Sequence, residues 1–344
     1  RIIGCLLGKP VEGITKSDLD FVLKATGNYP MHRYILKSEL SDEICEKSNF
    51  NLKDRSYADT IEHAPTDDDT NYTAMAAYKL IEKYGRDFEP LDVAKCWLDN
   101  QPKEAYCTAE RIAFINFVNG YEPPVSAIYK NPFREWIGAQ IRGDYFGYIN
   151  PGNPELAAEM AWRDASISHI KNGIYGEMFV AAMLAHAAVC EDVMQVILRG
   201  LGEIPDNSRL HSEIMKLIER FKKGLTAEEC RNWICERYDE RKSHHWCHSI
   251  ANALIVVMAL LYGENDFGKT ICLAVGAAFD TDCNGATAGS VIGMMFGDRV
   301  IPDKWSSVIN GKLETSIFGV GTVTIDELCG ITLRHAILPK NKLK

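Results

Sequence analysis

The sequence lacks the features that identify several common protein classes. Its 344 residues contain no Cys-x-x-Cys pair, and its eleven cysteines, an odd number, are scattered along the chain. This pattern argues against a disulfide framework or a zinc knuckle and indicates a reducing, cytoplasmic compartment. The most apolar stretches, 178–189 and 250–262, are shorter than the ~18 to 20 residues that a membrane span needs, so we expect buried helices and no membrane partner.

Basic residues are also too few for a protein that binds nucleic acid through its phosphates. The chain has 38 Lys and Arg against 47 Asp and Glu, which gives a formal net charge of −9. Neutralising phosphates requires a basic surface that releases counterions. We therefore expect no non-specific nucleic-acid binding.

Strand-like alternation is nearly absent from the sequence. Apolar residues recur instead at helical spacing, as at Leu254, Val257 and Leu261. The exception is VGTVTI at 320–325, which predicts a small hairpin or edge ribbon. No flexible Ser/Gly linker and no repeat of fixed period divides the chain. We predict an all-α fold, a single compact multi-helix domain over residues 1–344.

The most unusual stretch is TDDDT at 66–70, three consecutive carboxylates where a helix is expected to begin. Asp near a helix start accepts hydrogen bonds from free backbone N–H groups, so capping explains one or two of them. Capping does not explain a third, because like charges repel. A divalent cation offsets that repulsion, and hard oxygen ligands favour magnesium, calcium or manganese over zinc. We therefore expect Asp67, Asp68 and Asp69 to be metal ligands.

A metal site needs further ligands, and the second acidic cluster supplies candidates. Asp280 and Asp282 flank Thr281 at the expected start of another helix. Glycines recur every four positions along that helix, at Gly285, Gly289, Gly293 and Gly297. Such a ridge lets a neighbouring helix approach closely. It also resembles membrane dimer motifs, but the adjacent Asp pair and the short span argue against that alternative.

The third stretch is the opening segment GCLLGKPVEG, residues 4–13. Gly4 and Gly8 are spaced four apart on a predicted helix that Pro10 must end. Glu12 follows that end. Considered alone, Glu12 is an ordinary surface carboxylate.

Together these three stretches resemble the ADP-ribosylglycohydrolase family. The family's opening pattern of glycines and a glutamate matches Gly4, Cys5, Gly8 and Glu12. Its Thr/Ser-Asp-Asp-Thr motif matches Asp67, Asp68, Asp69 and Thr70, and its Asp-Thr-Asp-Thr/Ser motif matches Asp280, Thr281, Asp282 and Cys283. The resemblance spans the chain from end to end and is weakest in the middle.

Two segments in the middle also resemble family features. GAQIR at 138–142 is similar to the glycine-rich loop that lies against the ligand's phosphates, which implies ligand-binding roles for Gly138, Gln140 and Arg142. Arg142 either pairs with a phosphate or forms a salt bridge to a neighbouring helix. His169, in a Ser-His pair that matches one lining the family's ligand pocket, is alternatively a core histidine.

The resemblance implies an all-α fold with a metal site at its centre. Two magnesium ions, or manganese in their place, would be held by Asp67, Asp68, Asp69, Asp280 and Asp282. The implied reaction is hydrolysis of the glycosidic bond between ADP-ribose and an acceptor, so ADP-ribose or an ADP-ribosylated acceptor is the expected partner. An unligated carboxylate takes a proton from the attacking water, and Asp68 and Glu12 are the candidates for that catalytic base.

The chain departs from the family pattern at three positions, and these leave the substrate open. Cys283 replaces a hydroxyl ligand and is a poor ligand for a hard cation. Cys5 replaces the opening Asp, and Asp67 stands where Thr or Ser is usual unless Thr66 fills that role. The chain is most similar to a less-characterised, mostly microbial branch. Two alternatives to an ADP-ribosyl-acceptor hydrolase stay open: a ribosyl N-glycosidase that acts on nucleoside-like molecules, and a non-catalytic, crystallin-like member of the family.

Overall fold

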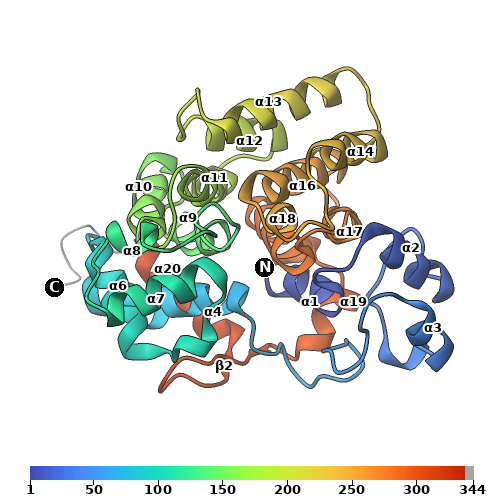
Figure 1. Ribbon diagram of the computed structural model, residues 1–344, viewed down its shortest axis with the longest axis horizontal. Helices are drawn as coiled ribbons and strands as arrows, with labels where there is room; N and C mark the ends of the chain where they lie inside the picture. The colour runs from blue at the N-terminus through green and yellow to red at the C-terminus, as the bar shows by residue number, and fades with distance from the viewer. Residues whose placement is uncertain (338–344) are drawn as a thin grey trace. The chain divides into compact units, whose positions relative to one another are not determined.

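The computed structural model describes residues 1–337, and its regular secondary structure is almost entirely helical (Figure 1). The predicted all-α fold is confirmed. Within the described range the strands are β1 (Lys312–Leu313) and β2 (Val323–Thr324), which pair antiparallel. The small ribbon predicted around 320–325 is therefore present. No helix in this range combines the length and the apolarity that a membrane crossing requires.

The chain forms two compact units, and each unit combines stretches that are distant in sequence. Unit 1 comprises Arg1–Pro65 and Glu213–Gly311, and unit 2 comprises Thr66–Ser212 and the chain from Lys312 onward. Helix α13 (Arg209–Lys222) contains one of the boundaries. The single domain expected over residues 1–344 stays a prediction.

Unit 1 contains two groups of helices. The first group is α1 (Ile2–Gly8), η1 (Lys9–Val11), α2 (Lys16–Ala25), η2 (Lys37–Glu39) and α3 (Asp42–Lys47). The second group is α14 (Ala227–Arg237), α15 (Ser243–Trp246), α16 (Ser249–Tyr262), α17 (Phe267–Gly276), α18 (Thr281–Phe296), η6 (Asp298–Val300), α19 (Asp303–Ser306) and η7 (Ser307–Ile309).

The core of unit 1 is built around α18, which packs against α1, α16 and α17. Helix α16 is buried over nearly its whole length, as its apolar sequence predicts. Helix α18 begins at the N-cap Asp280 and ends at Gly297, whose positive φ of 77° suits a glycine C-cap. The predicted start of this helix is confirmed, whereas Gly297 ends the helix and does not lie on its glycine ridge.

Unit 2 contains the remaining elements. Its first half is α4 (Asp68–Met75), the π-helix η3 (Ala76–Ile81), α5 (Glu82–Tyr84), α6 (Pro90–Asn100), η4 (Lys103–Ala105), α7 (Thr108–Val118), α8 (Val125–Ile128) and η5 (Gln140–Arg142). Its second half is α9 (Asp144–Tyr148), α10 (Pro154–Ala165), α11 (Asn172–Ala187), α12 (Val193–Leu201), the β1–β2 ribbon and α20 (Ile325–Ile337).

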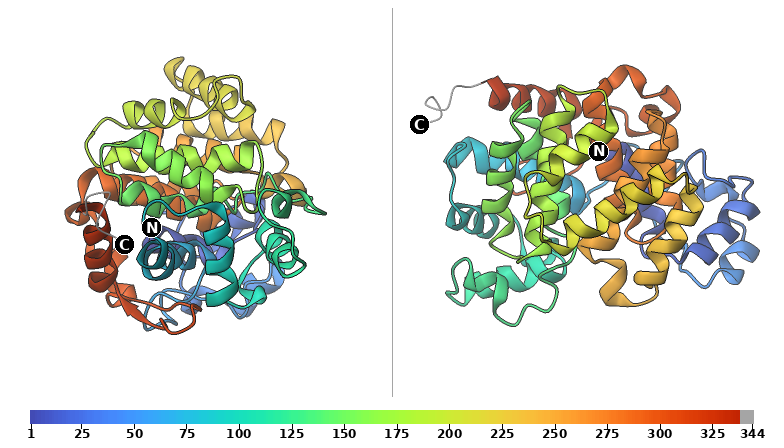
Figure 2. Two further views of the ribbon diagram at one scale, coloured as in Figure 1. Left: turned by 90° about the vertical axis from the view of Figure 1, so that its left-hand side faces the viewer. Right: turned by 90° about the horizontal axis from the view of Figure 1, so that it is seen from above.

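The core of unit 2 is built around α11, which lies beside α10 and also packs against α9, α12 and η5 (Figure 2). Most α11 side chains are buried, so its apolar run predicted a core helix correctly. The short helix η5 carries the segment that resembles a phosphate-binding loop. Packing of η5 on α11 fixes this segment against the core.

Candidate functional site

Three carboxylates converge in unit 1. Glu12, Asp280 and Asp282 each offer a carboxylate oxygen, and these oxygens lie within 4.8 Å of one another. Asp280 and Asp282 are 4% and 3% exposed, whereas Glu12 is exposed to solvent. Three hard oxygen donors fit a hard divalent cation such as magnesium, and the negative charges would repel one another without one.

The packing of α1 on α18 positions Glu12 beside the two aspartates. A Cβ atom on Gly8 would lie 2.3 Å from the backbone of Thr281 and Asp282, so only glycine permits this approach. The Thr281 hydroxyl donates a hydrogen bond of 2.9 Å to the Gly8 carbonyl. The chain then continues through η1, and Glu12 follows directly. The glycine at position 8 of the opening segment therefore allows the close helix contact that brings Glu12 near Asp280 and Asp282.

The backbone before Asp280 is strained. Ala278 and Phe279 have φ values of 65° and 64°, in the left-handed region that side chains other than those of Gly, Asn and Asp rarely adopt. Asn252 stabilises this strained backbone, because its Oδ1 accepts a 3.3 Å hydrogen bond from the Asp280 backbone N–H. The Cys247 thiol also donates to Asp280 Oδ2 across 3.5 Å. The local fold thus fixes the direction of the Asp280 side chain.

The carboxylates of TDDDT lie in unit 2, at the start of α4. Asp67 is the N-cap, and its Oδ1 accepts a 2.9 Å hydrogen bond from the Asp69 backbone N–H. The Thr70 hydroxyl donates to the Asp67 carbonyl across 3.1 Å. Asp68 and Asp69 occupy the first turn, where the helix dipole favours negative charge. Capping therefore accounts for Asp67, while Asp68 and Asp69 exceed what capping requires.

The segment GAQIR is tightly placed within unit 2. A Cβ atom on Gly138 would lie 1.8 Å from Glu110 Oε1, so the Glu110 carboxylate lies directly against the backbone of this loop. Gln140 is 1% exposed, and neither its amide oxygen nor its amide nitrogen has a hydrogen-bond partner among the described residues. Buried amides rarely lack partners, so this one is suited to binding a polar ligand group.

Arg142 lies at the centre of a buried charge cluster. Its Nε atom donates to Asp164 Oδ1 at 2.6 Å, and its NH1 donates to Glu110 Oε1 at 3.2 Å and to the Ser168 hydroxyl at 3.1 Å. Its NH2 lies 3.7 Å from Glu177 Oε2. The side chain is 2% exposed. Of the two alternatives given by the sequence, the structure places Arg142 in the salt bridge.

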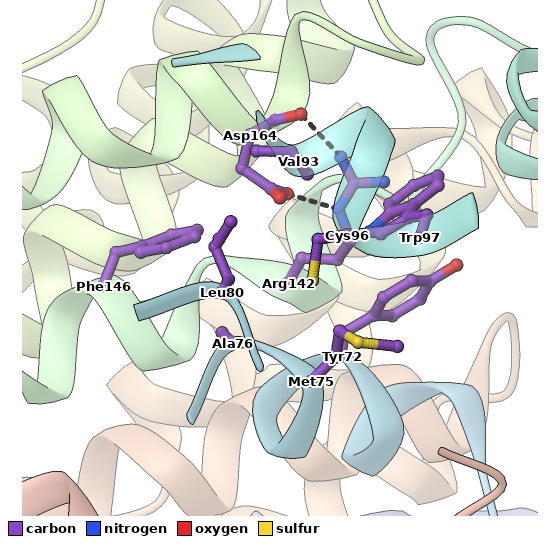
Figure 3. Close-up of a pocket in the computed structure, with 10 residues that line it drawn as sticks. All are labelled: Tyr72, Met75, Ala76, Leu80, Val93, Cys96, Trp97, Arg142, Phe146 and Asp164. Carbon is purple, nitrogen blue, oxygen red and sulfur yellow. Dashed lines mark hydrogen bonds and ion pairs between the residues drawn. The ribbon is translucent and has the colours of Figure 1, made fainter. Parts of the chain in front are cut away.

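Aromatic rings complete the surroundings of Arg142. The guanidinium lies 4.9 Å from the ring centroid of Trp97 and 5.4 Å from that of Tyr72. Figure 3 shows these side chains around a cavity, with the bonds between Arg142 and Asp164 dashed. The cavity has a volume of about 10 Å³. This volume is close to that of a single water site. The side chains around Arg142 are therefore tightly packed.

Burial controls ionisation in this cluster. Burial raises the pKa of Glu110 to about 7, although Arg142 acts in the opposite direction. Burial and Asp164 raise the pKa of Glu177 well above its ordinary range. Burial alone would lower the pKa of Arg142, but Asp164, Glu177 and Glu110 raise it above its ordinary value. Three buried acidic side chains therefore surround the Arg142 cation.

His169 lies beside the same cluster and is fully buried. Its Nδ1 is 2.8 Å from the Ser168 hydroxyl, and its Nε2 is 3.9 Å from Glu110 Oε1. Burial and the nearby Arg142 charge lower the pKa of His169 well below its ordinary range, so the imidazole is neutral. The core alternative for His169 agrees with this placement.

Several residues around these groups were not predicted from the sequence. Cys247 and Asn252 contact Asp280 from 33 and 28 positions away. A signal for Asn252 existed, because it is the lone strongly polar residue in the apolar run 250–262. Glu110 and Glu177 were similarly visible as acids within apolar helices. No local pattern marked Cys247.

Comparison with known proteins places these observations in context. A family model described as ADP-ribosylglycohydrolase matches residues 1–333. A solved structure titled "ADP-ribosylglycohydrolase-related protein complex" is similar to this chain, with a TM-score of 0.58 and 16% sequence identity, covering 97% of this chain and 98% of that one. At that identity the likeness shows the shared fold. A comparison with curated proteins returns no match.

Proposed function

This chain belongs to the ADP-ribosylglycohydrolase family, and from that premise we propose that it is a magnesium-dependent hydrolase that releases ADP-ribose from an acceptor. The family supports glycohydrolase activity on ADP-ribose conjugates. One observation carries the magnesium proposal: the carboxylate oxygens of Glu12, Asp280 and Asp282 lie within 4.8 Å of one another. Three hard donors at this spacing are suited to a hard cation.

We assign the metal-binding role to the two acidic motifs, as the resemblance implies. Asp280 and Asp282 are the proposed ligands of unit 1, and Asp67, Asp68 and Asp69 are those of unit 2. When bound, magnesium would lower the pKa of a coordinated water and polarise the ribose hydroxyls. The carboxylates of this chain would hold the cation and take the proton from the water.

Glu12 and Asp68 are the candidates for the catalytic base. Glu12 is the solvent-exposed member of its group, whereas Asp280 and Asp282 are buried. An exposed carboxylate beside buried ligands can reach a water and return its proton to solvent. This arrangement supports Glu12 as the base, and replacing Glu12 with Gln should lower kcat by about 10²-fold or more.

The ligand-binding role belongs to Gly138, Gln140 and His169 in this proposal. The unpartnered amide of Gln140 is suited to a polar group of ADP-ribose, and the buried neutral imidazole of His169 lies beside the same loop. Arg142 acts differently from the direct phosphate contact considered above. It joins the loop to Asp164 and Glu110, and so serves as a positioning residue.

The experiment that tests the proposal measures free ADP-ribose and free ribose by mass spectrometry. The panel comprises peptides ADP-ribosylated on Arg or Ser, ADP-ribosylated nucleic-acid ends, and nucleosides, each with magnesium, with manganese and with chelator. Magnesium-dependent ADP-ribose from one class supports the proposal and identifies the acceptor. Ribose from nucleosides alone would favour a ribosyl N-glycosidase, and no product from any substrate would favour a binding protein.

A matched pair of variants links the activity to the acidic group. Asp282→Asn removes a buried charge of the group, whereas Asp298→Asn changes an exposed carboxylate of the same unit. We expect loss of magnesium-dependent turnover in the first variant only, with the helical circular dichroism unchanged in both. Full activity of Asp282→Asn at limiting magnesium would contradict the proposed ligand set.

A further inference from the structure

Unit 1 contains a cavity of about 210 Å³ that the proposed hydrolase activity does not use. Its apolar lining consists of Tyr34, Leu36, Ala58, Trp305 and Val308. Arg33, Asp59 and Lys304 add charged groups. None of these residues belongs to the acidic group of Glu12, Asp280 and Asp282.

The aromatic wall of the cavity is rigid. Tyr34 and Trp305 meet edge to face with ring centroids 5.1 Å apart, and the Tyr34 hydroxyl donates to the Trp305 carbonyl across 3.0 Å. Trp305 is only 1% exposed. Because the Tyr34 hydroxyl is already bonded, Tyr34 contributes its ring to the cavity wall, and the buried Trp305 ring supports it from behind. A cavity of roughly 150 Å³ accommodates benzene, so this one has room for one aromatic ring with a small substituent.

The three charged side chains of the cavity differ in whether they have partners within the protein. Arg33 is paired with Glu39 across 2.7 Å. Asp59 accepts backbone N–H bonds of 2.7 and 2.9 Å from the start of η2, which stabilise its negative charge within the protein. Lys304 bonds only the His32 carbonyl, at 3.2 Å, and no carboxylate of the described residues lies within 4.0 Å of its ammonium. The cavity therefore offers one cation that a ligand anion can pair with.

We propose that this cavity binds a small aromatic carboxylate, with its ring against Tyr34 and Trp305 and its carboxylate on Lys304. The apolar walls desolvate the ring, and the Lys304 ammonium, 5.0 Å from the Trp305 ring, lies beside the aromatic surface. A carboxylate placed there pairs with the one cation that lacks an acidic partner. A neutral ring would gain only the apolar contacts, and a cationic ring would be repelled.

The test compares three probes of similar size on the full chain: benzoate, benzamide and benzylamine. Binding is followed by ligand-observed NMR titration at low ionic strength. We expect saturable binding of benzoate, binding about tenfold weaker for benzamide, and none for benzylamine. Equal affinities for the three probes, preferential binding of benzylamine, or no saturation by benzoate at millimolar concentration would overturn the proposal.

Variants locate the binding. Lys304→Gln, at an exposed side chain, should weaken benzoate about tenfold and leave benzamide unchanged, whereas the exposed control Lys53→Gln should change neither. Val308→Phe should fill the cavity and abolish both interactions. Asp282→Asn should keep benzoate binding. Binding that survives Lys304→Gln unchanged, or that disappears in Asp282→Asn, would place the probe elsewhere and contradict the assignment.

Discussion

A Cβ atom on Gly4 would lie 1.9 Å from the carbonyl oxygen of Gly285. Helices α1 and α18 therefore meet backbone to backbone, with no side chain between them at this point. The same approach continues at Gly8, beside Thr281. Because Glu12 follows α1 and η1 while Asp280 and Asp282 begin α18, this contact sets the spacing of the three carboxylates.

The first prediction concerns this helix contact. Gly4→Ala should lower the free energy of unfolding by about 1 to 3 kcal/mol or more, since the helices must move apart to admit a methyl group. It should also weaken magnesium binding. Gly293→Ala is the control, because nothing lies within 4 Å of a Cβ there and Ala is favoured over Gly in a helix by up to about 1 kcal/mol.

Chemical denaturation and a magnesium titration of both variants provide the measurement. A Gly4→Ala protein as stable as Gly293→Ala would show that the helices accommodate the methyl group. The contact would then be looser than the structure indicates.

The second prediction concerns the strained turn before Asp280. Ala278→Gly relieves a positive φ of 65°, which offsets the entropy that glycine adds to the unfolded chain. Ala277→Gly is the control, because Ala277 has an ordinary φ of −78° and glycine there gives no relief. We expect Ala278→Gly to be the more stable variant by about 1 kcal/mol.

The same pair of variants tests whether the strain serves the metal. A more flexible Ala278→Gly turn should raise the magnesium dissociation constant several-fold, although the protein itself is not destabilised. Equal stability of the two glycine variants would mean that the positive φ of Ala278 costs no stability. Unchanged magnesium affinity would show that the strained turn does not contribute to metal binding.

Local signals in the sequence predicted the parts of the site that local forces determine. Capping depends on a few neighbouring residues, so the helix starts at Asp67 and Asp280 followed from TDDDT and FDTD. The glycine ridge was only partly predictive. Gly285 packs against Gly4, but nothing lies close to Gly293, and Gly297 serves as a C-cap.

Long-range pairing was beyond the sequence. Arg142 meets Asp164 and Glu110 from 22 and 32 positions away, and no spacing rule connects residues on three different helices. No local pattern distinguishes a phosphate from a carboxylate as the partner of Arg142. Arg142 is buried among carboxylates, and this burial depends on how the helices of unit 2 pack.

The third prediction concerns the pH dependence of stability. Glu110 has a folded-state pKa of about 7, against an ordinary value of 4.5. Between these pH values the folded protein binds more protons than the unfolded chain, so the free energy of unfolding falls as the pH rises. This effect is fully present above pH 7 and disappears below pH 4.5.

Glu110→Gln removes this titration. Urea denaturation at pH 5, 6, 7 and 8 should show a decline of about 1 to 3 kcal/mol in the wild type that is smaller in the variant. The exposed carboxylate Glu122 provides the control, and Glu122→Gln should retain the decline. A variant with the same pH slope as the wild type would show that Glu110 is not the titrating group.

The last prediction separates the two roles considered for Arg142. Arg142→Met leaves Asp164, Glu110 and Glu177 buried without their cation, which should cost about 3 to 5 kcal/mol at pH 8. The loss should be smaller at pH 5, where Glu110 holds its proton. Arg334→Met is the control, because Arg334 is 59% exposed and pairs with Glu82 at the surface, where such pairs contribute about 0 to 1 kcal/mol. If Arg142 contacted ADP-ribose directly, its replacement would instead reduce ADP-ribose affinity with little change in stability and no dependence of the loss on pH.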